Sequence, residues 1–581
     1  MADHIGRLRE KLQEHNLAGF IVPRADEHQG EYVAPNSERL KWLTGFGGSA
    51  GRAVILAEHA ALFVDGRYML EAAKVLPPSI ETRHFIREGV GPWLREHAAA
   101  GKLGYDPWHS THSQTRELNK HAEAAGFTLA AVTKNPVDEI WNDRPDAPAT
   151  PVRKHPPELA GEDAEKKCAR IAGAVAAADA DVAVLTLPAS VAWLFNARAD
   201  DLPCVPVALS FAALHKSGKA TWFIDESRLA ADLRESLEGV VEYRCPRDFT
   251  TFLSSLGGSR VLIDPDTAPQ ICFQILTDAG AEPVHGSDPC LLPKARKNGA
   301  ELAAIREAHR QDGAALCRFL HWLEAAVPGG GVSELGAARR LYEMRAENAN
   351  CLGLSFETIS GSGPNGAIMH YRVDEESDRP LRVDEPYLVD SGAQYPGGTT
   401  DVTRTVCFAE PGGLFRRRYT QVLQGHIEVA RARFPSGVTG AAIDALARQF
   451  LWRDGVDYDH GTGHGVGAYL CVHEGPQGLT SRSRVPLEAG MVVSNEPGYY
   501  EEGAYGIRIE NLVEVCDFGD SLGFSTLTLA PIQRELIDAD LLSSQQREWL
   551  NDYHARVHEE IAPRLDDAEV VKWLERSTTP V

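Results

Sequence analysis

Short apolar runs and amphipathic stretches alternate through the first half of the chain, and they occur in the same order twice. The runs lie at residues 19–22, 42–43, 63–65 and 105–107 in the first copy and at 182–187, 193–194, 223–225 and 263–265 in the second. Phe63 precedes Asp106 by 43 residues and Phe223 precedes Asp264 by 41, which indicates a duplication. Strand patterns alternating with helical patterns predict that each copy is an α/β domain.

A proline-rich stretch and a change of pattern divide the chain into three predicted domains. Residues 143–151 contain Pro145, Pro148 and Pro151, which cannot continue a helix or a central strand, so we predict the first linker there. A second boundary is predicted near residues 289–293, and beyond it helical spacing predicts a long helix over residues 300–327. The predicted domains are residues 1–150, 151–293 and 294–581.

Composition and charge limit the partners that this chain can have. The 581 residues are 43% hydrophobic, and 59 basic against 82 acidic residues give a formal net charge of −23. This charge repels nucleic acid and anionic membranes, so we expect neither as a partner. The most apolar stretch, residues 171–195, is interrupted by Asp179 and Asp181, and we predict a helix followed by a strand there instead of a membrane span.

Two further patterns indicate the cellular compartment. Residues 1–12 alternate charged and apolar residues at helical spacing, so we expect no signal peptide. The ten cysteines include no Cys-x-x-Cys pair, and Cys351, Cys407 and Cys471 lie in apolar surroundings. Free thiols in a reducing cytoplasm fit this pattern better than a disulfide framework does, so we expect a cytoplasmic protein.

The candidate chemistry lies between residues 390 and 510, where five polar side chains follow apolar runs or glycine-rich turns. These candidate metal ligands are Asp390, Asp401, His464, Glu496 and Glu510. Asp390 ends an apolar run and Asp401 opens an alternating Thr/Val run, so two antiparallel strands are expected to bring these carboxylates together. His464 lies among glycines, Glu496 is predicted at a strand end, and Glu510 is predicted inside a strand.

The chemistry of these five side chains indicates the cofactor. Four carboxylates and one imidazole, without a thiolate, suit hard divalent ions such as Mn²⁺, with Zn²⁺ or Co²⁺ as alternatives. One divalent ion cannot neutralise four negative charges, and burying the excess charge would be costly. We therefore infer two metal ions that share bridging carboxylates, the arrangement that activates water for hydrolysis.

The order Asp, Asp, His, Glu, Glu resembles that of the dinuclear metallopeptidases of the pita-bread fold. Three motifs, Gly363-Pro-Asn-Gly-Ala-Ile-Met-His370-Tyr371, His460-Gly-Thr-Gly-His464 and Val472-His473-Glu-Gly-Pro476, are similar to the signatures of the aminopeptidase P family, the Xaa-Pro aminopeptidases. Residues 26–32, 45–51 and 139–145 resemble the amino-terminal part of its long, three-domain form. The resemblance covers nearly the whole chain, and no candidate metal ligand departs from it.

The resemblance implies a multidomain fold of the α/β and α+β classes. Two duplicated creatinase-like α/β front domains would precede a pita-bread catalytic domain. The implied activity is hydrolysis of the amino-terminal Xaa-Pro bond of peptides, so proline-containing peptides are the expected substrates. A homodimer formed through the catalytic domain is also implied, with Trp452 on its surface. Gly331-Val-Ser-Glu and Gly437-Val-Thr-Gly each precede a helical stretch, a hint that this domain has two related halves.

The resemblance also implies roles for the candidate ligands. Asp390 and Asp401 would hold one metal ion, His464 and Glu496 would complete the other, and Glu510 with Asp401 would bridge the two ions. Glu496 would also carry the proton of the attacking water.

Four other residues are expected near the reacting bond. By resemblance, His473 would stabilise the tetrahedral intermediate, while His370 and His460 would line the proline side of the cleft. Arg508 lies two residues before Glu510 and therefore on the same predicted strand face, where it is expected to brace a ligand carboxylate.

Other classes of protein remain open on the sequence. A prolidase would use the same five ligands on Xaa-Pro dipeptides, but prolidases resemble this chain only in the catalytic half and one front domain. A non-catalytic pita-bread peptide-binding protein would be expected to have broken ligands or a long acidic tail, and the sequence has neither. Methionine aminopeptidases normally lack both front domains.

Overall fold

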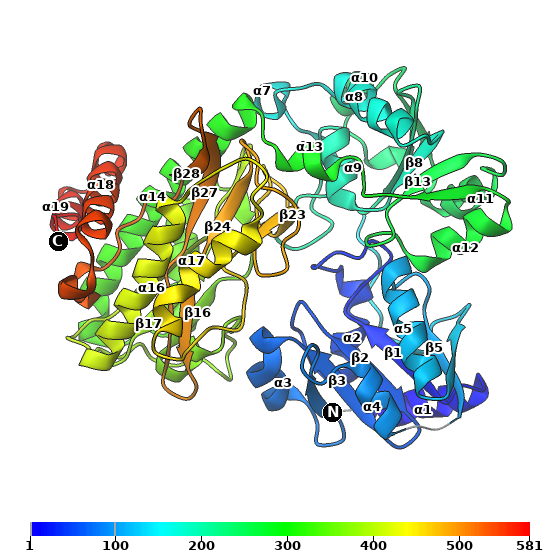
Figure 1. The fold of residues 1–581 in the computed structure, drawn as a ribbon, viewed down its shortest axis with the longest axis horizontal. Coiled ribbons are helices and arrows are strands. Elements are labelled where there is room, and N and C mark those ends of the chain that lie inside the picture. The colour runs from blue at the N-terminus through cyan, green and yellow to red at the C-terminus, as the bar shows by residue number, and fades with distance from the viewer. Residues whose placement is uncertain (1–2, 98–99) are drawn as a thin grey trace. The chain divides into compact units, whose positions relative to one another are not determined.

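The computed structural model describes residues 3–97 and 100–581, so the first two residues of the amino-terminal pattern lie outside the described part. The chain forms two compact units (Figure 1). Unit 1 comprises Met1–Pro157 and Glu162–Leu291, and unit 2 comprises Glu158–Gly161 and Leu292–Val581. The limits of the three domains stay a prediction, because the chain divides into only two compact units.

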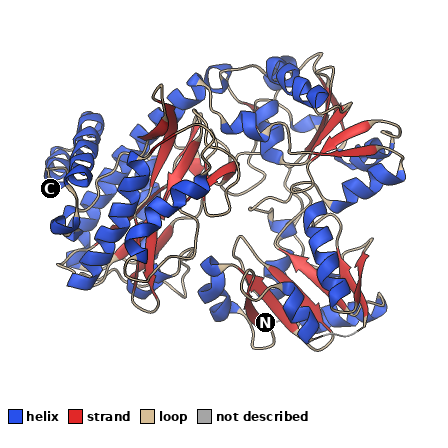
Figure 2. Ribbon diagram, in the orientation of Figure 1, coloured by secondary structure: helices blue, strands red, loops and turns tan. Residues whose placement is uncertain are grey.

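Unit 1 contains two six-stranded mixed sheets with equivalent strand order. The strands of the chain are drawn in red in Figure 2. The first sheet is ordered β4 (Glu81–His84), β3 (Ala60–Val64), β2 (Arg52–Leu56), β1 (Gly19–Pro23), β5 (Gly101–Tyr105) and β6 (Phe127–Ala131). The second is ordered β12 (Val241–Arg244), β11 (Ala220–Phe223), β10 (Phe211–His215), β8 (Val182–Leu185), β13 (Arg260–Ile263) and β14 (Glu282–His285). This identity of topology confirms the duplication that the apolar runs predicted.

Helices pack on the faces of both sheets. In the first half they are α1 (His4–Glu14), α2 (Arg39–Thr44), α3 (Met69–Val75), α4 (Val90–Glu96), α5 (His112–Ala124) and α6 (Pro136–Ile140). In the second half they are α8 (Ala164–Ala177), α9 (Pro188–Leu194), α10 (Ala231–Ser236), α11 (Phe249–Ser254) and α12 (Gln270–Asp278). The remaining short elements are β7 (Arg153–Lys154), α7 (Pro157–Ala160) and β9 (Ala197–Arg198). Residues 143–151 form neither helix nor strand, as their prolines predicted.

The helix and strand predicted in the apolar stretch at residues 171–195 are present, and a second helix, α9, follows them. The helix α8 ends before β8, and Asp179 lies in the turn between them with a left-handed φ of 54°. No helix of the described residues is long and apolar enough to cross a membrane. All ten cysteines are free thiols.

Unit 2 begins with α13 (Leu291–Ala295) and the long helix α14 (Gly299–Ala326). Asn298 and Glu301 form a reciprocal capping box that satisfies the first backbone amides of α14, which explains why the helix begins there. The other helices are α15 (Glu334–Ala346), α16 (Gly413–Arg431), α17 (Gly440–Trp452), α18 (Ser544–Ile561) and α19 (Ala568–Ser577).

The main sheet of unit 2 is antiparallel and six-stranded. Its order is β21 (Arg433–Phe434), β28 (Leu522–Thr526), β27 (Asn511–Asp517), β24 (Val492–Asn495), β22 (Gly463–Gly465) and β23 (Glu474–Leu479). A three-stranded sheet holds β16 (Ile359–Ser362), β17 (Tyr387–Ser391) and β20 (Val402–Val406). Smaller ladders join β15 (Gly353–Leu354), β18 (Ala393–Tyr395) and β19 (Gly398–Thr399), and also β25 (Gly498–Glu501) and β26 (Tyr505–Arg508).

Two halves of unit 2 repeat a local arrangement. The helix α14 packs on α15, and α16 packs on α17. Ser333 and Thr439 are the N-cap residues of α15 and α17, and each forms an isolated antiparallel bridge, to Pro380 and Pro486 respectively. These equivalent bridges agree with the two related halves that the repeated Gly-Val motif predicted.

A buried arginine ties the carboxyl-terminal helices to the strands that carry the acidic residues. Arg404, on β20, is 1% exposed. Its guanidinium donates to the backbone oxygen of Glu510 at 2.7 Å, to Asn511 Oδ1 at 2.8 Å and to the Tyr553 hydroxyl, on α18, at 3.0 Å. Because a buried guanidinium is stable only when its donors are satisfied, these contacts fix the three segments relative to one another.

Candidate metal centre

Two antiparallel strands bring Asp390 and Asp401 together, as the sequence predicted. Asp390 lies on β17 and pairs with Thr403 of β20, while Asp401 directly precedes β20. The Cα register therefore sets the two acids close to one another at one end of this strand pair.

The main sheet supplies the other candidate ligands. His464 lies on β22, which pairs with β24 through Gly465 and Val493, and Glu496 directly follows β24. Glu510 corrects the sequence prediction, because it lies between β26 and β27 and not inside a strand. The chain leaves the β25–β26 ladder there to enter the main sheet, and the Glu510 amide donates instead to Thr403 O at 3.2 Å.

The five side chains meet in one place. Ligand atoms of Asp401, His464 and Glu510 all lie within 4.8 Å of one another. His464 Nε2 is 3.5 Å from Asp401 Oδ2 and 3.4 Å from Glu496 Oε1. Asp390 raises the pKa of Asp401 both as a nearby charge and as a hydrogen-bond partner, after burial, which is the larger cause. The structure thus assembles all five predicted ligands.

The backbone fixes the orientation of His464. Its Nδ1 lies 2.9 Å from the carbonyl oxygen of Gly465. A carbonyl can only accept, so Nδ1 carries the proton and the Nε2 lone pair faces the carboxylates. This is the tautomer that a histidine needs in order to bind a metal ion.

Burial makes the acid cluster unusual. Asp390 is 7% exposed, Asp401 4% and Glu510 1%. The Oδ1 atoms of Asp390 and Asp401 are buried without a hydrogen-bond partner in the described part of the chain. Burial first, and then the neighbouring carboxylates, raises the pKa of Asp401 and of Glu510 well above the ordinary values. Buried oxygens without donors, in a group of like charges, fit a site for hard divalent cations.

One arginine is linked to two carboxylates of the cluster. Arg508 Nη2 donates to Asp390 Oδ2 at 2.7 Å, and Nε donates to Thr403 Oγ1 at 3.1 Å. Thr403 Oγ1 in turn donates to Glu510 Oε2 at 2.7 Å. Arg508 therefore braces Asp390 directly and Glu510 through Thr403, which gives the predicted brace a defined geometry.

A second chain of hydrogen bonds leads from Arg508 to His460. Arg508 Nη1 donates to the Tyr500 hydroxyl at 2.7 Å, and that hydroxyl lies 2.8 Å from His460 Nε2. His460 Nδ1 contacts the carbonyl of Gly461 at 2.7 Å, so Nε2 is the acceptor and Tyr500 donates to it. Burial raises the pKa of Tyr500 to about 12, which keeps its proton in place near neutral pH.

The remaining predicted histidines lie next to this network. The rings of His473 and His464 pack edge to face with centroids 4.1 Å apart. His370 follows Met369, whose carbonyl oxygen accepts from Arg508 Nη2 at 3.4 Å. The structure therefore places His473 against the candidate ligand His464, and the backbone next to His370 against Arg508.

Sequence reasoning missed Tyr500 and Thr403. Thr403 lies two residues after Asp401, and on a strand that spacing turns both side chains to the same face, so this signal was available. Tyr500 offered no such signal, because its hydroxyl reaches His460 only through the fold of the β25–β26 ladder.

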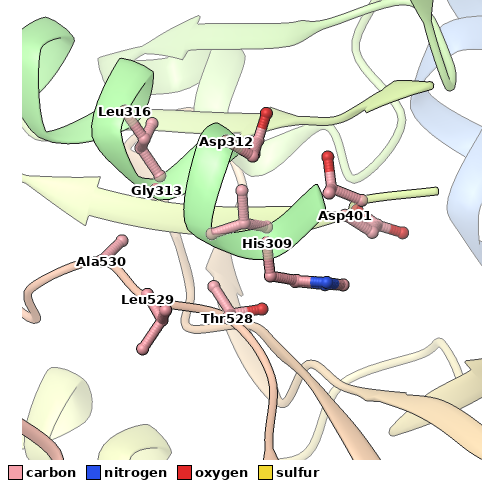
Figure 3. Close-up of a pocket in the computed structure, with 10 residues that line it drawn as sticks. His309, Asp312, Gly313, Leu316, Asp401, Thr528, Leu529 and Ala530 are labelled. Carbon is pink, nitrogen blue, oxygen red and sulfur yellow. The ribbon is translucent and has the colours of Figure 1, made fainter. Parts of the chain in front are cut away.

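A small cavity lies behind Asp401, between α14 and the segment at residues 528–530 (Figure 3). His309, Gly313 and Leu529 are among the residues that line it. It offers about 10 Å³ to the centres of water molecules, which is room for roughly one water. The cavity is therefore too small to admit a peptide.

Unit 1 contains a second group of possible ligands, His59, Glu81 and His97, whose ligand atoms also lie within 4.8 Å of one another. Glu81 Oε2 already accepts from Arg83 Nη2 at 2.6 Å and from Trp93 Nε1 at 3.3 Å. Burial is the largest single cause and raises the pKa of Glu81, but the hydrogen bonds from Arg83 and Trp93 and the charge of Arg83 together lower it. This group is partly exposed and its single carboxylate is already paired.

Family models match four consecutive parts of the chain. The metallopeptidase family M24 model covers residues 303–517, and the C-terminal region of peptidase M24 covers residues 520–581. Two models of the creatinase/prolidase N-terminal domain cover residues 4–139 and 143–301. The M24 model, at residues 303–517, covers all five candidate ligands.

Proteins of known name resemble the chain over its full length. It is 39% identical to a probable Xaa-Pro aminopeptidase P of Paracoccidioides brasiliensis, covering 100% of this chain and 99% of the relative. The X-prolyl aminopeptidase of Caenorhabditis elegans, described as a cytosolic enzyme with a di-nuclear active site, is 33% identical with a TM-score of 0.95, covering 100% and 99% of the two chains. The dipeptidase PepE of Mycobacterium ulcerans is 28% identical with a TM-score of 0.52, but covers only 63% of this chain and 95% of its own.

Proposed function

Because the chain belongs to metallopeptidase family M24 and matches proteins named Xaa-Pro aminopeptidase P over its whole length, we propose that it removes the amino-terminal residue of peptides that have proline in second position. The observation that carries the proposal is the close group of four carboxylates, three of them buried, and one histidine, with His460 and His473 next to it. The two front domains and the pita-bread domain agree with the fold that the sequence predicted.

The side chains in this group are suited to hold two divalent cations. Asp390 and Asp401 would hold one, His464 and Glu496 would hold the other, and Asp401 with Glu510 would bridge them. Two such cations would supply Lewis acidity and would lower the pKa of the water that attacks the peptide bond. Mn²⁺ is the proposed ion, because oxygen donors dominate the site, with Zn²⁺ and Co²⁺ as alternatives.

The residues around the ligands would bind and orient the peptide and move protons. Glu496 is less buried than the other acids, with a side chain 18% exposed, so it can accept a proton from water and return it. His473, packed against His464, would donate to the oxygen on which charge develops. His460 and His370 would line the proline side, and Tyr500 would hold His460 in one tautomer.

The length of the resemblance favours an aminopeptidase over a dipeptidase. The dipeptidase PepE aligns with 63% of the chain, whereas the X-prolyl aminopeptidase aligns with all of it. We propose that the second α/β half of unit 1 accounts for part of that difference. We propose that it belongs to a three-domain enzyme with limits at residues 1–150, 151–293 and 294–581.

The location and assembly of the protein are also proposals. Ten free cysteines and a related enzyme described as cytosolic support the cytoplasm. Trp452 is 49% exposed at the end of α17, which supports a contact with a second copy of unit 2. The charge of −23 supports neither nucleic acid nor an anionic membrane as a partner.

The deciding experiment compares hydrolysis of Arg-Pro-Pro and Ala-Pro by protein stripped with chelator and re-supplied with Mn²⁺, Zn²⁺ or Co²⁺. We expect rapid release of Arg from the tripeptide, little action on the dipeptide, and the highest rate with Mn²⁺. The opposite substrate preference would identify a prolidase. No turnover with any metal would contradict the proposal and favour a peptide-binding protein.

A further inference from the structure

Two buried lysines contact one buried glutamate at the beginning of unit 2. Lys294, on α13, lies 2.6 Å from Glu474 Oε2, and Lys297 donates to Glu474 Oε1 at 2.5 Å. The side chains of all three residues are at most 3% exposed. Sequence analysis assigned no role to any of them.

Burying these three charged side chains costs desolvation free energy. Burial raises the pKa of a carboxyl, but the two lysines overcome that effect and lower the pKa of Glu474. Burial lowers the pKa of Lys297, and Glu474 opposes that change. Glu301 also acts on Lys297 as a nearby negative charge, and replacing buried charges of this kind by well-packed apolar residues is often neutral or stabilising. Stability alone therefore does not explain these residues.

The position of Glu474 suggests what the triad does. Glu474 directly follows His473 and begins β23. Glu474 pairs with Gly465 on β22, and Gly465 is the neighbour of the candidate ligand His464. An added Cβ on Gly465 would lie 2.2 Å from the Glu474 oxygen of the main chain, so the two backbones are in close contact. A shift of Glu474 would therefore move both histidines.

The segment at residues 294–297 also contacts the chain just before β24, the strand that leads to Glu496. The Lys297 amide donates to Gly490 O at 3.0 Å, just before β24. Gly490 has a left-handed φ of 87°, and an added Cβ there would lie 2.7 Å from Lys297 O, so only glycine fits against this backbone. The residues 294–297 thus contact the two segments that lead to His473 and to Glu496.

We propose that Lys294 and Lys297 are positioning residues, which hold Glu474 and through it set the placement of His473 and His464 in the metal centre. The inference rests on the proposed function for its catalytic consequence. The placement itself is a property of unit 2 and can be measured without substrate.

The test uses the full-length variants Lys294→Met and Lys297→Met. Each leaves one lysine paired with Glu474, so neither creates an unpaired buried charge. The control is Arg306→Met, which removes a half-exposed arginine that binds the buried Glu514 on β27 of the same sheet with Nη2 at 2.7 Å, away from the predicted ligands. We expect kcat on Arg-Pro-Pro to fall by about 10-fold or more in both lysine variants, with KM within about 2-fold, because displaced catalytic groups slow the chemical step. The control is expected to keep kcat within about 2-fold.

Amide hydrogen exchange of chelator-stripped protein supplies the second readout. We expect exchange to become faster at Val466 and Glu496, whose amides donate to Val492 O and Thr462 O, in the lysine variants and not in the control. Unchanged exchange there, or a kcat equal to that of the wild type, would overturn the inference. If the wild type cleaves neither peptide, the proposed function fails, and the exchange comparison still decides the positioning role. If a methionine variant does not fold, Lys294→Arg and Lys297→Arg, which keep the positive charge, are compared with the control in the same way.

Discussion

Two groups of side chains in this molecule bring three possible ligands within 4.8 Å, and they differ in burial and in charge. The group in unit 2, with Asp401 and Glu510, is almost wholly buried, and Arg508 is the cation that braces it. The group in unit 1, with His59 and Glu81, is partly exposed, and Glu81 is paired with Arg83.

The difference shows that closeness of ligands does not by itself define a metal site. Carboxylates that are buried without enough donors are unfavourable unless cations neutralise them, whereas an exposed carboxylate with its own arginine has no such need. We therefore expect tight metal binding in unit 2 only.

The largest expected effect separates the two groups by activity. Asp401→Asn or Glu510→Gln is expected to lower kcat on Arg-Pro-Pro by at least about 10³-fold, because the proposed bridge between the two ions would lose a charge. Steady-state kinetics measures this, and circular dichroism checks that the variants fold. His59→Gln serves as the control and should keep kcat within about 2-fold. Near-normal turnover of either acid variant would refute the bridging roles.

Metal content sharpens the same comparison. After dialysis against metal-free buffer, we expect two tightly bound ions per chain by elemental analysis in the wild type and in His97→Gln. Asp401→Asn is expected to hold fewer, because it lacks one bridging carboxylate. Three ions in the wild type and two in His97→Gln would show instead that the group in unit 1 is also a site.

The two arginines allow an intermediate test. Arg508→Met is expected to lower kcat by about 10- to 100-fold, because Asp390 and Thr403 lose the donor that orients them. Arg83→Met removes the partner of Glu81 and is expected to leave kcat unchanged. Equal effects of the two substitutions would mean that Arg508 supports the fold and not the site.

The smallest expected effect is on the stability of the metal-free protein, where substitutions in the two groups should change the free energy of unfolding in opposite directions. The folded-state pKa values of Asp401 and Glu510 are raised, so the stability linked to them is present below the unfolded values near 4 and is lost as pH rises through the folded values. Asp401→Asn should therefore stabilise metal-free unit 2 at pH 8, by about 1 kcal/mol. The pKa of Glu81 is lowered, so Glu81→Gln should destabilise slightly at pH 8, by less than about 1 kcal/mol.

Thermal unfolding at pH 5 and pH 8 measures both variants. A stabilising Glu81→Gln or a destabilising Asp401→Asn in the absence of metal would contradict the assignment of burial and charge to the two groups.

Much of this architecture could be predicted from local patterns. Apolar runs gave the duplicated sheets because strand order repeats when the sequence pattern repeats. The five candidate ligands could be chosen from the sequence because each lies next to an apolar run or a glycine-rich turn. Their assignment as ligands stays a prediction, since geometry alone does not identify bound ions.

What could not be predicted depends on contacts between distant segments. Glu510 was placed inside a strand because its neighbours are apolar, but the chain changes ladders at that residue. The pairing of Lys297 with Glu474 joins residues 177 positions apart, and although Glu474 lies in the Val472–Pro476 motif, nothing in that motif indicates a lysine partner. Tyr500 reaches His460 only after two ladders have formed.

The anchoring of Arg404 has a consequence for how the chain is made. A ribosome synthesises residues in order, and domains tend to fold as they emerge. The last of the five candidate ligands, Glu510, is synthesised 43 residues before Tyr553, whose hydroxyl accepts a hydrogen bond from Arg404. A nascent chain that has exposed every ligand therefore still lacks part of what holds them, so we expect metal capture to be completed only after α18 has left the ribosome.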